Sequence, residues 1–324
     1  MVGAIVIVGV GPQLPGSITT SESWDAWHSS IAAVPVLGSS TIARTVESMR
    51  RAGITDVSVL GANVWAGKNG FISSEEQAWR IAGDELKTCD ERDLEAVVIT
   101  RTGQYVECEW SSLIERHRGY GEAVTRAFDR DGALDVWVVD PRRFRAEENL
   151  PAALEGAKAA EGGVGGYVNR LQGARDLRRL VLDMLSLRCR VQPNGTEVRP
   201  GLWMAEGTQI ARKARIVAPA YIGRGVKISD DCLITRCSNV EANSCIDFGT
   251  AIEDSSVLSD TYVGIGLDLS HSVVDGSEIL NLNHEIRLRI SDPVVLRRDP
   301  NKAQQNSQSV FEMKEMAFSS RERQ

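Results

Sequence analysis

The sequence lacks the signals of several classes of protein. Its six cysteines form no CxxC pair, and they show no metal-like spacing with the four histidines. No apolar run approaches the length of a membrane span. The apolar stretch Met1 to Val10 lacks the basic n-region of an export signal, so we interpret it as a buried first strand. We therefore expect a cytoplasmic protein with reduced thiols.

The sequence also lacks a basic stripe. The net charge is -7, and lysine and arginine are spread along the chain without a basic stripe. This excludes the usual grounds for a nucleic-acid partner. The 324 residues are enough for two domains, each with its own core.

A period of six residues is the strongest regularity that the sequence contains. Aliphatic residues occupy every sixth position, and the residue four places later is mostly small. The aliphatic positions are Ile210, Ile216, Ile222, Ile228, Ile234, Val240, Ile246, Ile252 and Leu258. Neither a helix nor an ordinary strand has this period, whereas three six-residue steps close one coil of a triangular solenoid.

This repeat predicts a left-handed parallel β-helix over residues 201–285, with an irregular last coil after a one-residue slip at Val263. Known coils that it resembles set the geometry of oligomers, and some carry acyltransferase sites in which a histidine beside a coil is the general base. His271, at the end of the repeat, is the candidate for that role. The fold alone does not choose between these functions.

The N-terminal half alternates short apolar runs with helical patterns. The predicted strands are 4–8, 57–60, 96–100 and 136–139, and the predicted helices are 41–52 and 111–117. Gly53 is a natural C-terminal stop for the first of these helices. Alternation of this kind predicts an α/β sandwich with a mostly parallel sheet.

Two segments resemble the nucleotide-sugar pyrophosphorylases, the sugar-phosphate nucleotidyltransferase family. They are Val34-Pro-Val-Leu-Gly38 with the helix that leads to Gly53-Ile54, and Ala96 to Glu107 followed by Leu113-Ile-Glu-Arg-His117. The order of the parts is also similar, with an α/β domain before a left-handed β-helix. The resemblance implies a Rossmann-like sandwich of the GT-A type, a nucleotide or nucleotide sugar as ligand, and Mg²⁺ if the protein is active.

The resemblance also implies where a site would lie. Gly9 and Gly11 correspond to the loop that wraps the nucleotide with backbone N–H groups, although a tight turn after the strand explains them as well, since Pro12 removes one donor. Asp140, after the predicted strand 136–139, is the candidate metal ligand. It could equally cap a helix that continues to Phe144.

Departures from the family pattern concern the charges that catalysis needs. No Arg or Lys lies between Gly11 and Arg44, Ile31 stands at the position of the family's lysine, and Thr102 stands at that of a metal-binding Asp. The block that grips the sugar phosphate is deleted around 129–133. Transfer between two phosphate-bearing substrates depends on Mg²⁺ and basic side chains, so their loss predicts a large loss of rate.

The sequence therefore predicts a nucleotidyltransferase-like protein, catalytically impaired, that acts as a regulatory or assembly subunit in nucleotide-sugar or polysaccharide metabolism. It would assemble with itself or with a paralogous subunit through the β-helix. Two alternatives stay open: an active sugar-phosphate nucleotidyltransferase with a rearranged site, and a hexapeptide-repeat acyltransferase that uses His271.

The predicted division of the chain has four parts. Residues 1–170 form the α/β domain, 171–200 a linker helix and turn, 201–285 the β-helix, and 286–324 a C-terminal strand and polar tail. The linker contains an amphipathic helix from Ala174 to Leu187. The pattern assigns no role to Trp24, Trp27 and His28 beyond a lid or an interface.

Overall fold

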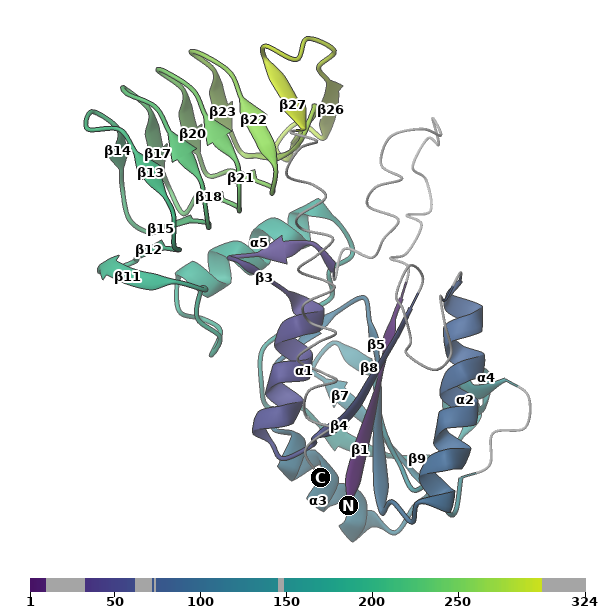
Figure 1. Cartoon of the computed structure of the whole chain (residues 1–324). Helices are drawn as coiled ribbons and strands as arrows, with labels where there is room; N and C mark the ends of the chain where they lie inside the picture. Colours follow the sequence, from purple (N-terminus) through teal and green to yellow (C-terminus); the bar gives the residue numbers. More distant parts are fainter. Residues whose placement is uncertain (10–32, 62–71, 73, 145–148, 299–324) are drawn as a thin grey trace. The chain divides into compact units, whose positions relative to one another are not determined.

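The structure is a computed structural model that describes residues 1–9, 33–61, 72, 74–144 and 149–298. The chain forms two compact units, of which unit 1 comprises 1–34 and 39–177 and unit 2 comprises 35–38 and 178–324. The last division falls inside helix α5 (Ala174–Leu185), within the predicted linker 171–200 (Figure 1). Pro35–Gly38, far from the repeat in the sequence, belongs to unit 2.

Unit 1 is a mixed α/β structure built on a six-stranded sheet. Its helices are α1 (Thr41–Arg51), α2 (Glu75–Glu91), α3 (Trp110–Tyr120) and α4 (Leu150–Gly156). The strands of the main sheet are β1 (Val2–Val8), β4 (Asp56–Gly61), β5 (Ala96–Thr102), β7 (Val124–Asp129), β8 (Gly132–Val139) and β9 (Ala159–Gly163). A short pair in the same unit joins β6 (Tyr105–Val106) to β10 (Val168–Asn169). A hairpin pairs β3 (Ser39–Ser40) with β2 (Pro35–Val36), which is counted in unit 2.

The main sheet has the strand order β4-β1-β5-β8-β7-β9. Strand β1 pairs in parallel with β4 and β5, and β7 pairs in parallel with β9. Strand β8 runs antiparallel to both of its neighbours, β5 and β7. The prediction of alternating elements on a mostly parallel sheet is confirmed, but the reversed direction of β8 was not foreseen.

Helices cover both faces of this sheet (Figure 1). Side chains alternate along a strand, so Ile5 and Ile7 of β1 pack in one cluster with α2 and α4, whereas Ala4 and Val6 pack in another with α1 and α3. This is why the strands of unit 1 are nearly continuous apolar runs. Among the described residues, no helix combines the length and the apolar character that crossing a membrane requires.

Helix α1 illustrates how the local sequence sets an element. The Ser40 hydroxyl accepts a hydrogen bond from the N–H of Ala43 and so caps the first turn. Gly53, one residue after the C-cap Ala52, has a φ of +86°, a conformation that favours glycine. The helix predicted over 41–52 is confirmed, with Gly53 as its stop.

Unit 2 consists mainly of short strands in three parallel sheets. The first sheet contains β12 (Leu202–Met204), β15 (Ala220–Ile222), β18 (Asn239–Val240), β21 (Ser256–Val257) and β24 (Ser272–Asp275). The second contains β13 (Gln209–Ile210), β16 (Lys227–Ile228), β19 (Cys245–Ile246) and β22 (Thr261–Val263). The third contains β14 (Arg215–Ile216), β17 (Leu233–Thr235), β20 (Ala251–Glu253) and β23 (Asp268–Ser270).

The chain visits the three sheets in turn, and we call each set of three strands a coil. Antiparallel strands complete the sheets at their ends: β11 (Thr196–Arg199) pairs with β12, β25 (Glu278–Asn281) with β24, β26 (Ile286–Arg289) with β25, and β27 (Leu296–Arg298) with β22. Each coil stacks on the next through parallel backbone hydrogen bonds, so the repeat read from the sequence is the stacking unit of unit 2.

A column of aliphatic side chains fills the interior of the coils, as the repeat predicts. The step of six is not kept to Leu258, however. Val240 pairs with Val257, and it is Val257 that joins the buried column. The predicted position of the slip, Val263, is wrong. The slip occurs one repeat earlier, at Val257, because the turn between Ile252 and Val257 is one residue shorter than in the preceding coil.

Hydroxyl side chains at the turns explain why the small positions are seldom alanine in the later coils. The hydroxyls of Ser238, Ser244, Thr250 and Ser255 each donate to a backbone carbonyl of the next coil, over 2.6 to 3.3 Å. Each also accepts a backbone N–H from the next coil. Because a buried hydroxyl and a buried N–H both need partners, the small residue also satisfies the turn.

The segment Pro35–Gly38 is held in unit 2 by a buried carboxylate. Glu241 accepts hydrogen bonds from the N–H groups of Leu37 (2.7 Å) and Gly38 (3.0 Å), and from the Asn239 amide (2.8 Å). Leu37 and Gly38 both have positive φ, of +50° and +84°, which turns their N–H groups toward one anion. A segment near the start of the chain is therefore part of the C-terminal unit.

Candidate functional site

The carboxyl ends of β1 and β5 form the edge of the unit 1 sheet where the resemblance to nucleotidyltransferases predicts a nucleotide. The N–H of Gly9 donates to the carbonyl of Thr102 (3.1 Å) and is thus already committed to the backbone. A Cβ on Gly9 would lie 2.6 Å from that carbonyl oxygen and 3.0 Å from Nε of Arg101. Glycine is needed here for a close approach of two strands. Gly11 lies outside the described residues.

Thr102 and Arg101 lie at the carboxyl end of β5. Thr102 is 3% exposed, and its hydroxyl oxygen has no hydrogen-bond partner. Arg101 forms ion pairs with Glu75 (2.6 Å) and with Asp135 (3.5 Å), and the bond to Glu75 raises the pKa of the guanidinium above its usual value. The carboxylates at this edge therefore neutralise an arginine. Within the described ranges, no group of three or more His, Cys, Asp or Glu side chains could hold a metal ion.

Asp140 lies at the other edge of the sheet. Strand β8 is antiparallel, and Val139 pairs with Val97 near the start of β5, so Asp140 follows at the end opposite to Gly9 and Thr102. Its carboxylate accepts the N–H of Arg142 (3.0 Å), and its carbonyl accepts the N–H of Phe144 (2.9 Å). It closes a turn, and the candidate metal ligand Asp140 does not lie beside Gly9.

His117 is buried in unit 1. Its Nδ1 lies 2.8 Å from the Thr125 hydroxyl. Burial lowers the pKa of this histidine below its usual value, and the nearby Asp140 opposes that shift. His28, with Trp24 and Trp27, lies outside the described residues, as does the tail 299–324.

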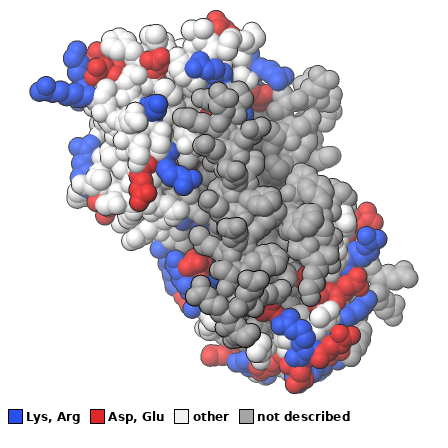
Figure 2. Space-filling view, viewed as in Figure 1, with Lys and Arg blue, Asp and Glu red and all other residues white. Residues whose placement is uncertain are grey.

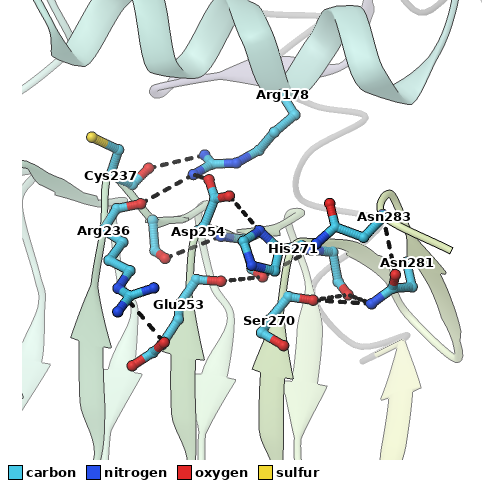
Figure 3. Close-up of polar contacts among 12 residues, drawn as sticks. Arg178, Arg236, Cys237, Glu253, Asp254, Ser270, His271, Asn281 and Asn283 are labelled. Atoms are coloured by element: carbon cyan, nitrogen blue, oxygen red, sulfur yellow. Dashed lines mark hydrogen bonds and ion pairs between the residues drawn. The ribbon is translucent and has the colours of Figure 1, made fainter.

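Unit 2 contains a second cluster, in which Asp254 contacts both His271 and Arg178 (Figure 3). Nδ1 of His271 is 2.6 Å from a carboxylate oxygen of Asp254. The other carboxylate oxygen of Asp254 accepts a hydrogen bond from Arg178 (2.8 Å). The three side chains thus form a chain of contacts from helix α5 to the last coil.

Two shortened turns bring Asp254 and His271 together. Strands β17 and β20 pair Leu233 with Ala251, eighteen residues apart, but β18 and β21 pair Asn239 with Ser256, seventeen apart. The deleted residue leaves two residues, Asp254 and Ser255, between β20 and β21, and Asp254 has a φ of +43°. His271, with a φ of +49°, is the equivalent turn between β23 and β24. Equal turns on successive coils stack their side chains.

The next residues fix the backbone on the C-terminal side of His271. The carbonyl of His271 accepts the N–H of Leu282 (2.7 Å), and the Asn281 amide donates to the carbonyl of Ser270 (3.2 Å). Asn283 in turn donates its backbone N–H to the Asn281 side chain (3.2 Å; Figure 3). The histidine is therefore held at its backbone as well as at its ring.

The arrangement can accept a proton at the exposed side of the ring. A carboxylate only accepts hydrogen bonds, so the contact suits a neutral imidazole that donates from Nδ1 and keeps its lone pair on Nε2. The side chain of His271 is 39% exposed and that of Asp254 31%. Burial raises the pKa of the nearby Cys237 thiol and so disfavours its thiolate form. The cluster suits general-base chemistry on a nucleophile that the substrate brings.

Sequence reasoning found His271 but not its two partners. Asp254 was hidden because the period of six was continued past it to Leu258, and Arg178 lies 76 residues earlier in a helix. The signal that could have found Asp254 is the run of two small residues, Ser255 and Ser256, which fits two frames of the repeat. No sequence signal points to Arg178.

On the face that Figure 2 shows, Lys and Arg lie among Asp and Glu in the described parts of both units.

No protein-family model matches the chain, and no curated protein matches it.

Proposed function

We propose that the chain is a nucleotidyltransferase-like protein, related to the nucleotide-sugar pyrophosphorylases, that is catalytically impaired and acts as a regulatory or assembly subunit. An α/β unit with a mostly parallel sheet precedes coils of short parallel strands, which supports the two-part architecture expected from that resemblance. In this proposal unit 1 is a GT-A-type sandwich and the coils form a left-handed parallel β-helix. The ligand would be a nucleotide or a nucleotide sugar.

The observation that carries this proposal is the sheet edge at Thr102. Nucleotidyl transfer relies on carboxylates that hold Mg²⁺ and on cations that contact the phosphates. Here the buried residue is a threonine, and Arg101 is neutralised by Glu75. The groups that would stabilise a phosphate transition state are absent or paired among the described residues of this edge.

A pyrophosphate-release assay tests catalysis directly. The protein is incubated with Mg²⁺, the common nucleoside triphosphates and sugar 1-phosphates, and we expect no turnover above background. Turnover of about one per second or faster would sink this proposal. The alternative of a rearranged active site then predicts that Asp140→Ala abolishes the activity, and a surface variant such as Lys87→Ala is the control.

Ligand binding is tested separately by thermal shift. A ligand that binds the folded state raises the melting temperature whether or not catalysis survives. We expect a nucleotide or nucleotide sugar to do so. Absence of any shift over the whole panel, with and without Mg²⁺, would leave the coils as the only functional part.

Exposed apolar side chains on the coils support the assembly role. Phe248 is 48% exposed and Ile265 65%, and they occupy equivalent turns of successive coils, since Ile246 pairs with Val263. Val294 is also exposed, and its neighbour Val295 accepts a hydrogen bond from the N–H of Gly264, the residue before Ile265. We propose that this patch contacts a second copy of the chain.

The oligomeric state tests the patch. Light scattering after size exclusion should give an oligomer for the native chain and a smaller species for Phe248→Ser with Ile265→Ser. Val198→Ser, at an exposed valine of β11, is the matched control and should leave the mass unchanged. A native monomer at micromolar concentration argues against self-assembly and leaves a paralogous partner.

A second candidate function is favoured by the contact between His271 and Asp254. We propose acyl transfer from a thioester to an amine or a hydroxyl group. Nε2 of His271 would take the proton of the acceptor as its nitrogen or oxygen attacks the thioester carbonyl. The carbon–sulfur bond then breaks, and the leaving thiolate regains a proton.

Release of free thiol from acyl-CoA, with amino- and hydroxyl-bearing sugars as acceptors, tests this candidate. His271→Asn should lower the rate by about 10²-fold or more. His284→Asn, at an exposed histidine of the same unit, is the control. If calorimetry detects no binding of CoA, the candidate fails.

A further inference from the structure

Arg178 differs from the other two members of its cluster because it is buried. Its side chain is 4% exposed, against 31% for Asp254 and 39% for His271. It also comes from another part of the fold, since it lies on helix α5 whereas Asp254 and His271 belong to turns of the coils. A buried arginine beside an exposed histidine needs a physical reason.

Hydrogen bonds hold both terminal nitrogens of the Arg178 guanidinium. One terminal nitrogen donates to the carbonyl of Cys237 (2.9 Å), and the other donates to Asp254 (2.8 Å) and to the carbonyl of Arg236 (3.3 Å) (Figure 3). Arg236 and Cys237 both have positive φ, so this turn presents two carbonyls toward the helix. The planar fork is thereby locked in one orientation.

Asp254 is the carboxylate that compensates this buried charge. Burial lowers the pKa of Arg178, and the hydrogen bond and charge of Asp254 raise it. Because an uncompensated buried cation is costly, one oxygen of Asp254 is held on Arg178. The second oxygen is then directed to His271, and the position of the ring proton follows from the position of the arginine.

We infer that Arg178 is the positioning residue of this pair and that helix α5 controls His271 through it. With Arg178 in place, Asp254 holds the Nδ1–H form of the imidazole and leaves Nε2 as the base. Helix α5 begins in unit 1, at Ala174–Leu177, and continues in unit 2 from Arg178. Any event that moves α5 removes the cation from Asp254 and releases the ring.

The chemical use of this device rests on the proposed acyl transfer, but its existence does not. Nitrogen NMR of histidine side chains reports the tautomer directly, without substrate. The protein labelled at histidine is measured at about pH 8.5, where an ordinary histidine is neutral. His117, whose Nδ1 lies against Thr125 in unit 1, is an internal reference for folding.

Three variants are compared with the native chain. Arg178→Met removes the charge and the fork, and we expect the Nδ1–H tautomer of His271 to be lost in favour of a mixture. Arg178→Gln removes the charge but keeps donors for the carbonyls, and it serves if the methionine variant does not fold. Arg236→Met is the matched control, because Arg236 is on the same turn but 67% exposed and paired with Glu253 at 3.8 Å.

The expected result is a change of tautomer in the Arg178 variants and none in Arg236→Met. If His271 keeps the Nδ1–H form in a folded Arg178 variant, the inference is wrong, whatever the enzyme assays give. Where acyl transfer is detected, the same variants should lower kcat by about 10²-fold with little change in KM. Failure of acyl transfer in the native chain, with the tautomer change present, removes the second candidate function but not the positioning role.

Discussion

The two units contain the same kind of ion pair and use it differently. At the sheet edge of unit 1, Arg101 binds Glu75, and at the turn of unit 2, Arg178 binds Asp254. Glu75 also accepts a hydrogen bond from the indole of Trp79, which is a buried residue of the core. Asp254 instead turns its second oxygen to a histidine that is partly exposed. The carboxylate of the pair thus contacts an indole in unit 1 and an imidazole in unit 2.

The difference lies in what stands beyond the carboxylate. In unit 1 the carboxylate is flanked by an arginine and a tryptophan, neither of which transfers protons at ordinary pH. In unit 2 it is flanked by imidazole, which does. The proposed acyl transfer would therefore use the coils of unit 2, whereas the family resemblance implies a site at the sheet of unit 1.

The largest expected effect is on stability and compares the two ion pairs. Asp254→Ala leaves Arg178 as an uncompensated buried cation and should lower the free energy of unfolding by about 3 to 5 kcal/mol. Glu75→Ala, whose arginine is partly exposed, should cost about 1 kcal/mol. Urea unfolding measures both. Equal losses would mean that the two pairs are equally buried and that the comparison fails.

A smaller effect is expected at Glu241, which holds a segment of early sequence in unit 2. Glu241→Gln keeps the shape but offers one acceptor oxygen where the carboxylate offers two to the N–H groups of Leu37 and Gly38. A loss of about 2 kcal/mol is expected, because a buried N–H is left without a partner. Thermal unfolding followed by circular dichroism measures this, with Glu285→Gln, an exposed position, as the control.

The smallest expected effect is on stability in acid and concerns the buried His117. Burial lowers the pKa of His117 in the folded state, so the unfolded state binds its proton more tightly. Stability should therefore decline as the pH falls through the ordinary histidine range near 6.5 and should be fully present above it.

His117→Asn should flatten this decline relative to the native chain. Urea unfolding at several values between about pH 7.5 and pH 5.5 gives the comparison. A native stability that is constant over that interval would contradict the burial of His117.

The periodicity of the repeat was sufficient to predict the coils and most of their buried column. The predicted buried position was wrong at Leu258. The residue before it, Val257, is also aliphatic, and two serines precede that valine. Either valine or leucine satisfies the interior, so local sequence is consistent with two frames. The pairing of Val240 with Val257 on the neighbouring coil selects one of them. That same choice creates the turn at Asp254, which explains why the site was not recognised.

The failure in unit 1 has a different cause. The strand at 136–139 was correctly predicted, but its direction is not a property of its own residues. The antiparallel pairing of β8 sends Asp140 to the far edge of the sheet, away from Gly9. Hydrophobic patterns report which side chains are buried, and both directions bury the same ones.

By itself, the sequence determined the period of the coils, the α/β alternation, the first helix with its stop at Gly53, and the candidacy of His271. These follow from side-chain patterns that act over a few residues, such as apolar spacing, capping and glycine turns. The tertiary structure alone decided the direction of β8, the frame at Val257 and the meeting of Arg178 with Asp254. Each of these depends on hydrogen bonds or ion pairs between residues far apart in the chain, and local patterns carry no information about such partners.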